Sequence, residues 1–79
     1  MKIVATAIPG CLELVPAVRA DARGRFVKTF HAGLFAEHGL STAFVEAYYS
    51  LSTAGVLRGL HFQTPPHHHT KLVYCIAGS

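Results

Sequence analysis

The chain has 79 residues, of which 51% are hydrophobic and 14% are charged. This length allows one small domain at most, and the apolar composition excludes an intrinsically disordered chain. The formal charge of +3 comes from Lys and Arg residues that form no basic run, so nucleic acid binding is not indicated. The apolar content is high for so small a surface, which predicts that another subunit or further chain covers some apolar faces.

The cysteine content and the hydrophobic pattern indicate a cytoplasmic protein. Cys11 and Cys75 are too few for a disulfide framework and lie in no CxxC motif, so we expect free thiols in a reducing compartment. The residues before Pro9 contain no long apolar segment typical of a signal peptide. No stretch approaches the roughly 20 apolar residues of a membrane span, so no membrane partner is expected.

The first half of the chain alternates short β-prone segments with turn signals. Asp21 and Gly24 frame a predicted turn, because Asp favours the first position of a turn and Gly the last. Gly39 is expected to end a short helix. The predicted elements are a strand at Lys2–Ile8, an extended segment at Leu12–Val15, an alternating segment at Arg25–Phe30 and a helical turn at Ala32–His38.

The second half is rich in β-branched and aromatic residues, which predicts three strands separated by loops. The segments Thr42–Ser50, Val56–Phe62 and Lys71–Ala77 are the predicted strands. A turn at Ser52–Gly55 and a loop at Thr64–Thr70 separate them. This pattern predicts an all-β sandwich or barrel in which residues 1–79 form a single, partial domain. The last strand has no return strand after it, so we expect a truncated chain or a sheet that a partner completes.

A specific motif follows the turn at Ser52–Gly55. Gly55–Gln63 reads GVLRGLHFQ, then come Pro65–Pro66 and Lys71–Val73. Together with the RGxFxK pattern at Arg23–Lys28 and the YSxS pattern at Tyr49–Ser52, this resembles the dTDP-4-dehydrorhamnose 3,5-epimerase family. The order and spacing of these patterns match that family along nearly the whole chain. The part of the family pattern that is absent is the carboxy-terminal half.

This resemblance implies a cupin-type jelly roll, usually dimeric, which uses no metal and no organic cofactor. The implied substrate is a nucleotide-diphosphate sugar whose sugar is a 4-keto-6-deoxyhexose. The implied reaction inverts the configuration at C3, C5 or both of this sugar. Such a reaction belongs to deoxysugar synthesis, for example of dTDP-rhamnose, which supplies surface polysaccharides. dTDP is the family default for the nucleotide, with CDP and GDP as alternatives. The implied assembly is a homodimer, in which strands are shared between subunits.

Two residues match the family's catalytic positions. A proton beside a keto group is best removed by a base that titrates near neutral pH, and histidine is the natural choice. The enolate oxygen that then forms needs a cation or a hydrogen-bond donor. By resemblance, His61 is the base and Lys71 stabilises the enolate. The strand pattern allows the two to lie side by side across a hairpin. The alternatives are a hydrogen-bonded core histidine and a solvated lysine at a strand end.

The remaining candidate residues are substrate contacts. Arg23 and Arg58 are expected to bind the diphosphate, since the guanidinium group presents a planar pair of donors; on a regular strand, however, Arg58 points away from the face of His61. Phe26 is expected to stack on the nucleobase, although a core role is also open. Polar contacts to the base, ribose or sugar are assigned to Glu46, Ser50, Ser52 and Gln63, with ordinary strand polarity as the alternative.

The tract His67–His69 suggests a metal site at first sight. Metal-binding cupins carry an HxH pair followed by Glu, whereas Gln63 stands here where the second histidine belongs. Three adjacent histidines in a loop do not easily converge on one ion. We therefore expect no metal.

The resemblance also leaves an alternative function open. In the family, a tyrosine and an aspartate from the second half act as the opposing acid and as the partner of the histidine, and neither position falls in this sequence. Without an acid on the opposite face, a base can remove a proton but epimerisation is incomplete. The alternative is a catalytically inactive half-cupin that serves as a nucleotide-sugar binding or assembly module.

Overall fold

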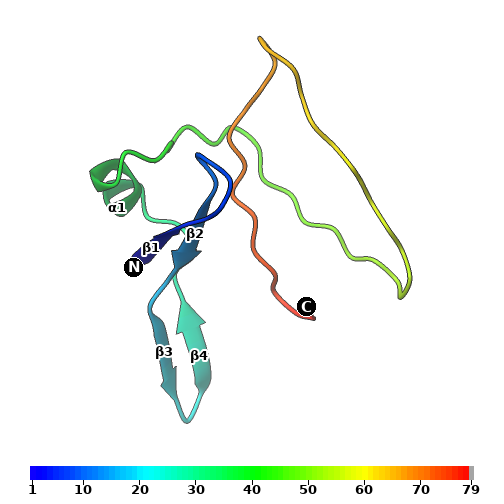
Figure 1. Ribbon diagram of the computed structural model, residues 1–79. Coiled ribbons are helices and arrows are strands. Elements are labelled where there is room, and N and C mark those ends of the chain that lie inside the picture. The colour runs from blue at the N-terminus through cyan, green and yellow to red at the C-terminus, as the bar shows by residue number, and fades with distance from the viewer. Residues whose placement is uncertain (79) are drawn as a thin grey trace. The chain divides into compact units, whose positions relative to one another are not determined.

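A computed structural model describes residues 1–78, and Ser79, the last residue of the predicted domain, lies outside the described residues. The chain divides into two units, Met1–Ala43 and the residues from Phe44 onward. The first unit contains the elements β1 (Lys2–Ala5), β2 (Leu12–Val15), β3 (Val18–Asp21), β4 (Gly24–Val27) and α1 (Ala32–Glu37) (Figure 1).

The strands β1 and β2 form an antiparallel hairpin in which Ile3 pairs with Leu14. The loop between them closes locally: the Thr6 hydroxyl donates to the Cys11 carbonyl at 2.8 Å and accepts from the Ile8 amide at 3.2 Å. Gly10 has a φ of +80°, which non-glycine residues rarely adopt. The predicted strand at Lys2–Ile8 is therefore correct in type but ends earlier, because these loop bonds take over after Ala5.

The strands β3 and β4 form a second antiparallel hairpin, with Asp21 opposite Gly24 and Arg19 opposite Phe26. Ala22 and Arg23 make the connecting turn. Gly24 has a positive φ of +123°, so the turn predicted from Asp21 and Gly24 is confirmed. The predicted alternating segment is also confirmed in part, since β4 ends at Val27 rather than at Phe30.

The helix α1 has defined residues at both ends. At its start, the Leu34 amide donates to Nδ1 of His31, the N-cap residue, at 3.1 Å. At its end, the Leu40 amide donates to the Phe35 carbonyl at 2.9 Å and the Gly39 amide to the Ala36 carbonyl at 3.1 Å. This pair of bonds is a Schellman motif, which needs a left-handed residue at its centre, and Gly39 has a φ of +70°. The predicted helix and its glycine stop are confirmed.

Substitution of Gly39 tests this helix end. We expect Gly39→Ala to destabilise the first unit by about 1 kcal/mol, the cost of a left-handed conformation for a residue with a Cβ atom. No atom lies within 4 Å of the added Cβ, so the effect is conformational rather than steric. Gly39→Asn is the control and should cost less, because asparagine tolerates this conformation. Amide exchange of Leu40 measures both, and equal protection in Gly39→Ala and the wild type would contradict the prediction.

The core of the first unit is small. Among the described residues, Phe35 is the single buried hydrophobic side chain, with 2% of its surface exposed. Its ring meets that of Phe30 edge to face, with 4.8 Å between centroids and 79° between planes, which is a favourable aromatic arrangement. Because a short chain buries little apolar surface, this cluster carries much of the packing of the unit.

The second unit has no helix or strand in its described part, residues 44–78 (Figure 1). Two predicted connections are confirmed: the Val56 amide donates to the Thr53 carbonyl at 3.3 Å, and the His67 amide to the Thr64 carbonyl at 2.9 Å. The strands predicted at Thr42–Ser50, Val56–Phe62 and Lys71–Ala77 are wrong for this structure. A strand exists only when a neighbour accepts and donates its backbone hydrogen bonds, and a β-prone sequence does not supply that neighbour.

Apolar side chains of this second unit remain exposed. Leu60 is fully exposed, Val45 is 98% exposed and Leu57 is 92% exposed. Isolated exposed apolar residues are ordinary, but so many within one segment are unusual for a folded domain by itself. No helix in the described part of the chain is long and apolar enough to cross a membrane.

Candidate functional site

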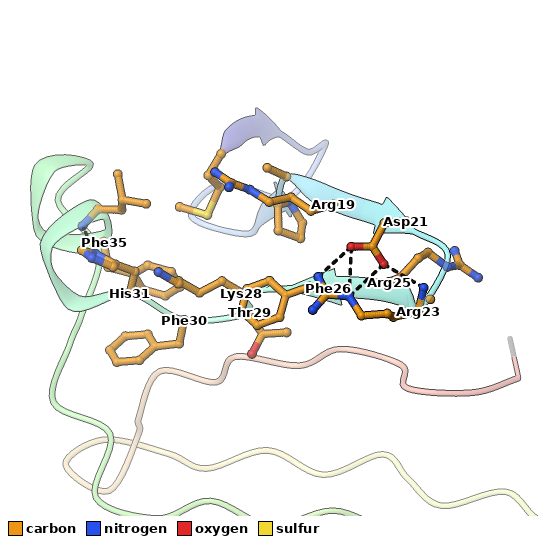
Figure 2. Close-up of a pocket in the computed structure, with 15 residues that line it drawn as sticks. Arg19, Asp21, Arg23, Arg25, Phe26, Lys28, Thr29, Phe30, His31 and Phe35 are labelled. Carbon is orange, nitrogen blue, oxygen red and sulfur yellow. Dashed lines mark hydrogen bonds and ion pairs between the residues drawn. The ribbon is translucent and has the colours of Figure 1, made fainter.

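The β3–β4 hairpin contributes to an open cavity of about 840 Å³ in the first unit (Figure 2). Two of the predicted substrate contacts, Arg23 and Phe26, line it. Phe26 is 65% exposed, so its ring is available to a ligand rather than packed in the core. The structure thus places one of the two arginines predicted to bind the diphosphate in the same cavity as the phenylalanine predicted to stack on the nucleobase, whereas Arg58 does not line it.

The cavity is cationic. Four positively charged side chains line it against one carboxylate, that of Asp21: Arg19, Arg23, Arg25 and Lys28. A hollow lined mainly by one sign of charge raises the local concentration of counter-ions. The arrangement therefore suits an anionic ligand such as a nucleoside diphosphate.

Asp21 and Arg23 face each other at the tip of the hairpin (Figure 2). Nη2 of Arg23 lies 2.7 Å from Oδ2 of Asp21, and its Nε lies 3.2 Å from the same oxygen. The Arg23 amide also donates to Oδ1 at 2.8 Å, which closes an Asx turn. Sequence reasoning identified Asp21 as a turn residue but missed its contact with Arg23, for which the spacing of an Asp two residues before the Arg was the available signal.

This contact stabilises both charged forms. The side-chain hydrogen bond from Arg23, followed by the backbone hydrogen bond, lowers the pKa of Asp21 from its ordinary value of 3.8, while slight desolvation opposes the shift. The Asp21 carboxylate raises the pKa of Arg23. The two pKa values move in opposite directions for the same reason, because each partner favours the ionised form of the other.

The depressed pKa predicts an acid-sensitive hairpin tip. A carboxyl whose folded pKa is lowered contributes stability above its unfolded pKa, and loses that contribution as the pH falls through the folded pKa. The Asp21 carboxyl resonance should therefore titrate below pH 3.8, and the Arg23 amide resonance should move with it. NMR titration measures both, with Asp21→Asn as the control that should abolish the transition. A midpoint at or above 3.8 would contradict the prediction.

Two further predicted contacts meet in the second unit. Nε of Arg58 donates to the Ser52 hydroxyl at 2.9 Å, and its Nη2 donates to the Leu51 carbonyl at 3.3 Å. Arg58 is thereby tied to the turn that precedes the motif rather than to a regular strand. Because Arg58 lies in no strand, the expectation that it points away from the face of His61 has no counterpart in this structure.

The predicted catalytic pair is not assembled in the described chain. His61 and Lys71 are both exposed, and no hydrogen bond joins them within residues 1–78. The expected hairpin between them is wrong here, because neither segment forms a strand. Glu46, Ser50 and Gln63 are exposed as well. Their predicted roles remain predictions.

The described residues contain no group of three or more His, Cys, Asp or Glu side chains able to hold a metal ion. His67–His69 follow a turn in an exposed loop and form no such group. Within residues 1–78, Cys11 and Cys75 are free and exposed.

Comparisons with known proteins agree with the motif. Residues 5–79 match the family model described as dTDP-4-dehydrorhamnose 3,5-epimerase. The chain is 43% identical over 79 residues to a protein of that name from Shigella flexneri, covering 99% of this chain and 44% of the relative. It is 44% identical over 78 residues to one from Neisseria gonorrhoeae, covering 99% of this chain and 24% of the relative.

A relative from Streptomyces niveus, named dTDP-4-dehydrorhamnose 3-epimerase, is 38% identical over 80 residues, covering all of this chain and 39% of the relative. No solved structure matches the chain. The chain spans less than half the length of these relatives.

The proteins matched are named as epimerases of a dTDP-linked sugar, which are isomerases by class. The chain belongs to the dTDP-4-dehydrorhamnose 3,5-epimerase family.

Proposed function

We propose that the protein epimerises a dTDP-linked 4-keto-6-deoxyhexose at C3, C5 or both. The observation that carries this proposal is the match of residues 5–79 to the epimerase family. The cationic cavity beside Phe26 supports it, because a nucleoside diphosphate carries both an aromatic base and a polyanionic group. The names of the relatives include both 3,5-epimerases and a 3-epimerase, so the proposal covers both positions.

The chemistry assigns one step to each catalytic residue. The imidazole of His61 takes the proton from the carbon beside the keto group, and the electron pair of the broken C–H bond moves onto the carbonyl oxygen. The ammonium group of Lys71 stabilises the resulting enolate. An acid then returns a proton to the opposite face of the same carbon. Glu46, Ser50, Ser52, Arg58 and Gln63 are proposed as substrate contacts in the second unit, and Arg23 and Phe26 in the first.

The fold and assembly are part of the same proposal. We place the chain in an all-β jelly roll of the cupin type, with residues 1–79 as part of a single domain that further chain or a partner subunit completes. The exposed apolar side chains of residues 44–78 support this completion. We also propose a homodimer and a cytoplasmic location, the latter supported by the free thiols of Cys11 and Cys75.

Solvent exchange tests this function. The protein is incubated in D₂O with a dTDP-4-keto-6-deoxyhexose, and NMR follows deuterium incorporation at C3 and C5. Deuterium exchange at C3 or C5 is expected. The configuration of that carbon should invert where an acid returns the proton to its opposite face. An absence of exchange at both carbons would overturn the proposed activity.

The alternative function is a half-cupin that binds or assembles without turnover. The exposure of His61 and Lys71, with no strand to hold them, favours this alternative for the chain by itself. It predicts dTDP binding by titration calorimetry together with no deuterium incorporation. The same experiment therefore separates the two functions.

A further inference from the structure

Arg23 is bonded to Asp21 in two ways at the tip of the β3–β4 hairpin, through its backbone amide and through its guanidinium group. Its backbone amide donates to Oδ1 of Asp21 at 2.8 Å, and its guanidinium group donates to the same carboxylate through Nε and Nη2. One carboxylate thus restrains both ends of this long side chain. Without Asp21, the side chain of Arg23, which is 91% exposed, would sample many rotamers in solvent.

The contact also selects which edge of the guanidinium remains available. A guanidinium carries five N–H donors, one on Nε and two on each Nη. Asp21 occupies the edge formed by Nε and Nη2. Nη1 makes no hydrogen bond within residues 1–78, so the edge formed by Nη1 and Nη2 is left for a ligand. Two adjacent donors on that edge match two oxygens of one phosphate group.

We propose that Asp21 is a positioning residue, which orients Arg23 so that this free edge receives the diphosphate of the nucleotide sugar. The proposal rests on the proposed function, because it assumes that the cavity of the first unit binds a nucleoside diphosphate. Asp21 acts through Arg23 and does not touch the substrate. A held guanidinium loses less conformational freedom on binding than a free one, which improves the affinity for the anion.

A second effect of Asp21 opposes the first. Its negative charge repels an anionic ligand, but solvent and salt weaken this repulsion at so exposed a site, so we expect it to be the smaller of the two effects. The positioning effect needs Arg23, whereas the repulsion persists without it. A double-mutant cycle between Asp21 and Arg23 therefore separates the two.

The experiment measures dTDP affinity by titration calorimetry for the wild type, Asp21→Asn, Arg23→Ala and the double variant. Asp21→Asn keeps the side-chain oxygen that accepts from the Arg23 amide, so the turn is retained while the charged pair is lost. We expect Asp21→Asn to weaken dTDP binding about three- to tenfold, the range that one immobilised side chain accounts for. In the Arg23→Ala background, the same substitution should leave the affinity unchanged or raise it slightly.

Thymidine provides the matched ligand control, because it carries the base without the phosphates. Its affinity should be the same in the wild type and in Asp21→Asn. An unchanged or higher dTDP affinity in Asp21→Asn would overturn the positioning role alone and leave the proposed function standing. A wild type that binds no dTDP would overturn both. Equal weakening of dTDP and thymidine binding would show general damage to the hairpin and also overturn the role.

Discussion

His61→Asn is expected to lower the rate of deuterium incorporation into the 4-keto sugar by about 10²- to 10⁴-fold, the usual contribution of a positioned general base. Asparagine is close to histidine in polarity but takes up no proton near neutral pH. The effect should appear at the carbon that the wild type exchanges, because the loss of the base stops C–H cleavage rather than substrate binding. NMR of the sugar in D₂O measures the rate, and calorimetry should give a dTDP affinity close to that of the wild type.

His68→Asn is the matched control, since it makes the same change in the exposed loop at 64–70. Its exchange rate should equal that of the wild type. Retention of more than about a tenth of the wild-type rate in His61→Asn would fall outside the range for a general base and remove His61 from that role. The proposed family function would then need another base.

Phe35→Ala is expected to destabilise the first unit by about 3 kcal/mol, at the low end of the range for a buried phenylalanine because the surrounding cluster is small. Small domains are typically stable by only a few kcal/mol, so this loss should unfold α1. The substitution removes the edge-to-face contact with Phe30 and the one buried hydrophobic side chain among residues 1–78. Amide exchange at Leu40, whose N–H is bonded to the Phe35 carbonyl, measures the effect directly.

Phe35→Leu should retain part of the protection, because leucine fills part of the same volume. Phe62→Ala removes an equally large side chain that is 81% exposed, and it should leave Leu40 protection unchanged. If Phe35→Ala and Phe62→Ala protected Leu40 equally well, the Phe30–Phe35 cluster would not be the core of the unit.

The features of the fold that were predictable are those made by neighbouring residues. The turn between Asp21 and Gly24 forms because the Asp21 side chain accepts the Arg23 amide, and both partners lie within the turn itself. The helix stop at Gly39 forms because glycine adopts the left-handed conformation at little cost. The turn before Val56 is equally local. Such bonds need no distant partner, so residue type and order are sufficient to predict them.

The three strands predicted in the second half failed for the opposite reason. Residues such as Val45, Tyr48 and Tyr49 have strong β propensity, yet they stay exposed and in no strand within residues 44–78. A strand needs a second strand to pair with, and the sequence of the first strand does not specify which segment that second strand is. The hairpin expected to join His61 to Lys71 failed with those strands.

The candidate site divides in the same way. The motif around His61 and the pattern that begins at Arg23 were sufficient to predict the family, because their residues and spacing resemble that family, and the family match confirms the prediction. The contact between Asp21 and Arg23, and the edge of the guanidinium that it leaves open, were not predicted from residue types.

The sequence by itself thus determined the family, the local turns and the helix end, since each depends on residues that are close along the chain. The tertiary structure alone decided that Phe26 stays exposed in the cavity and that Phe35 forms the core. Those outcomes depend on side-chain rotamers and on which surfaces exclude water. Side-chain rotamers and the exclusion of water are both set by packing in three dimensions, which cannot be deduced from the order of residues alone.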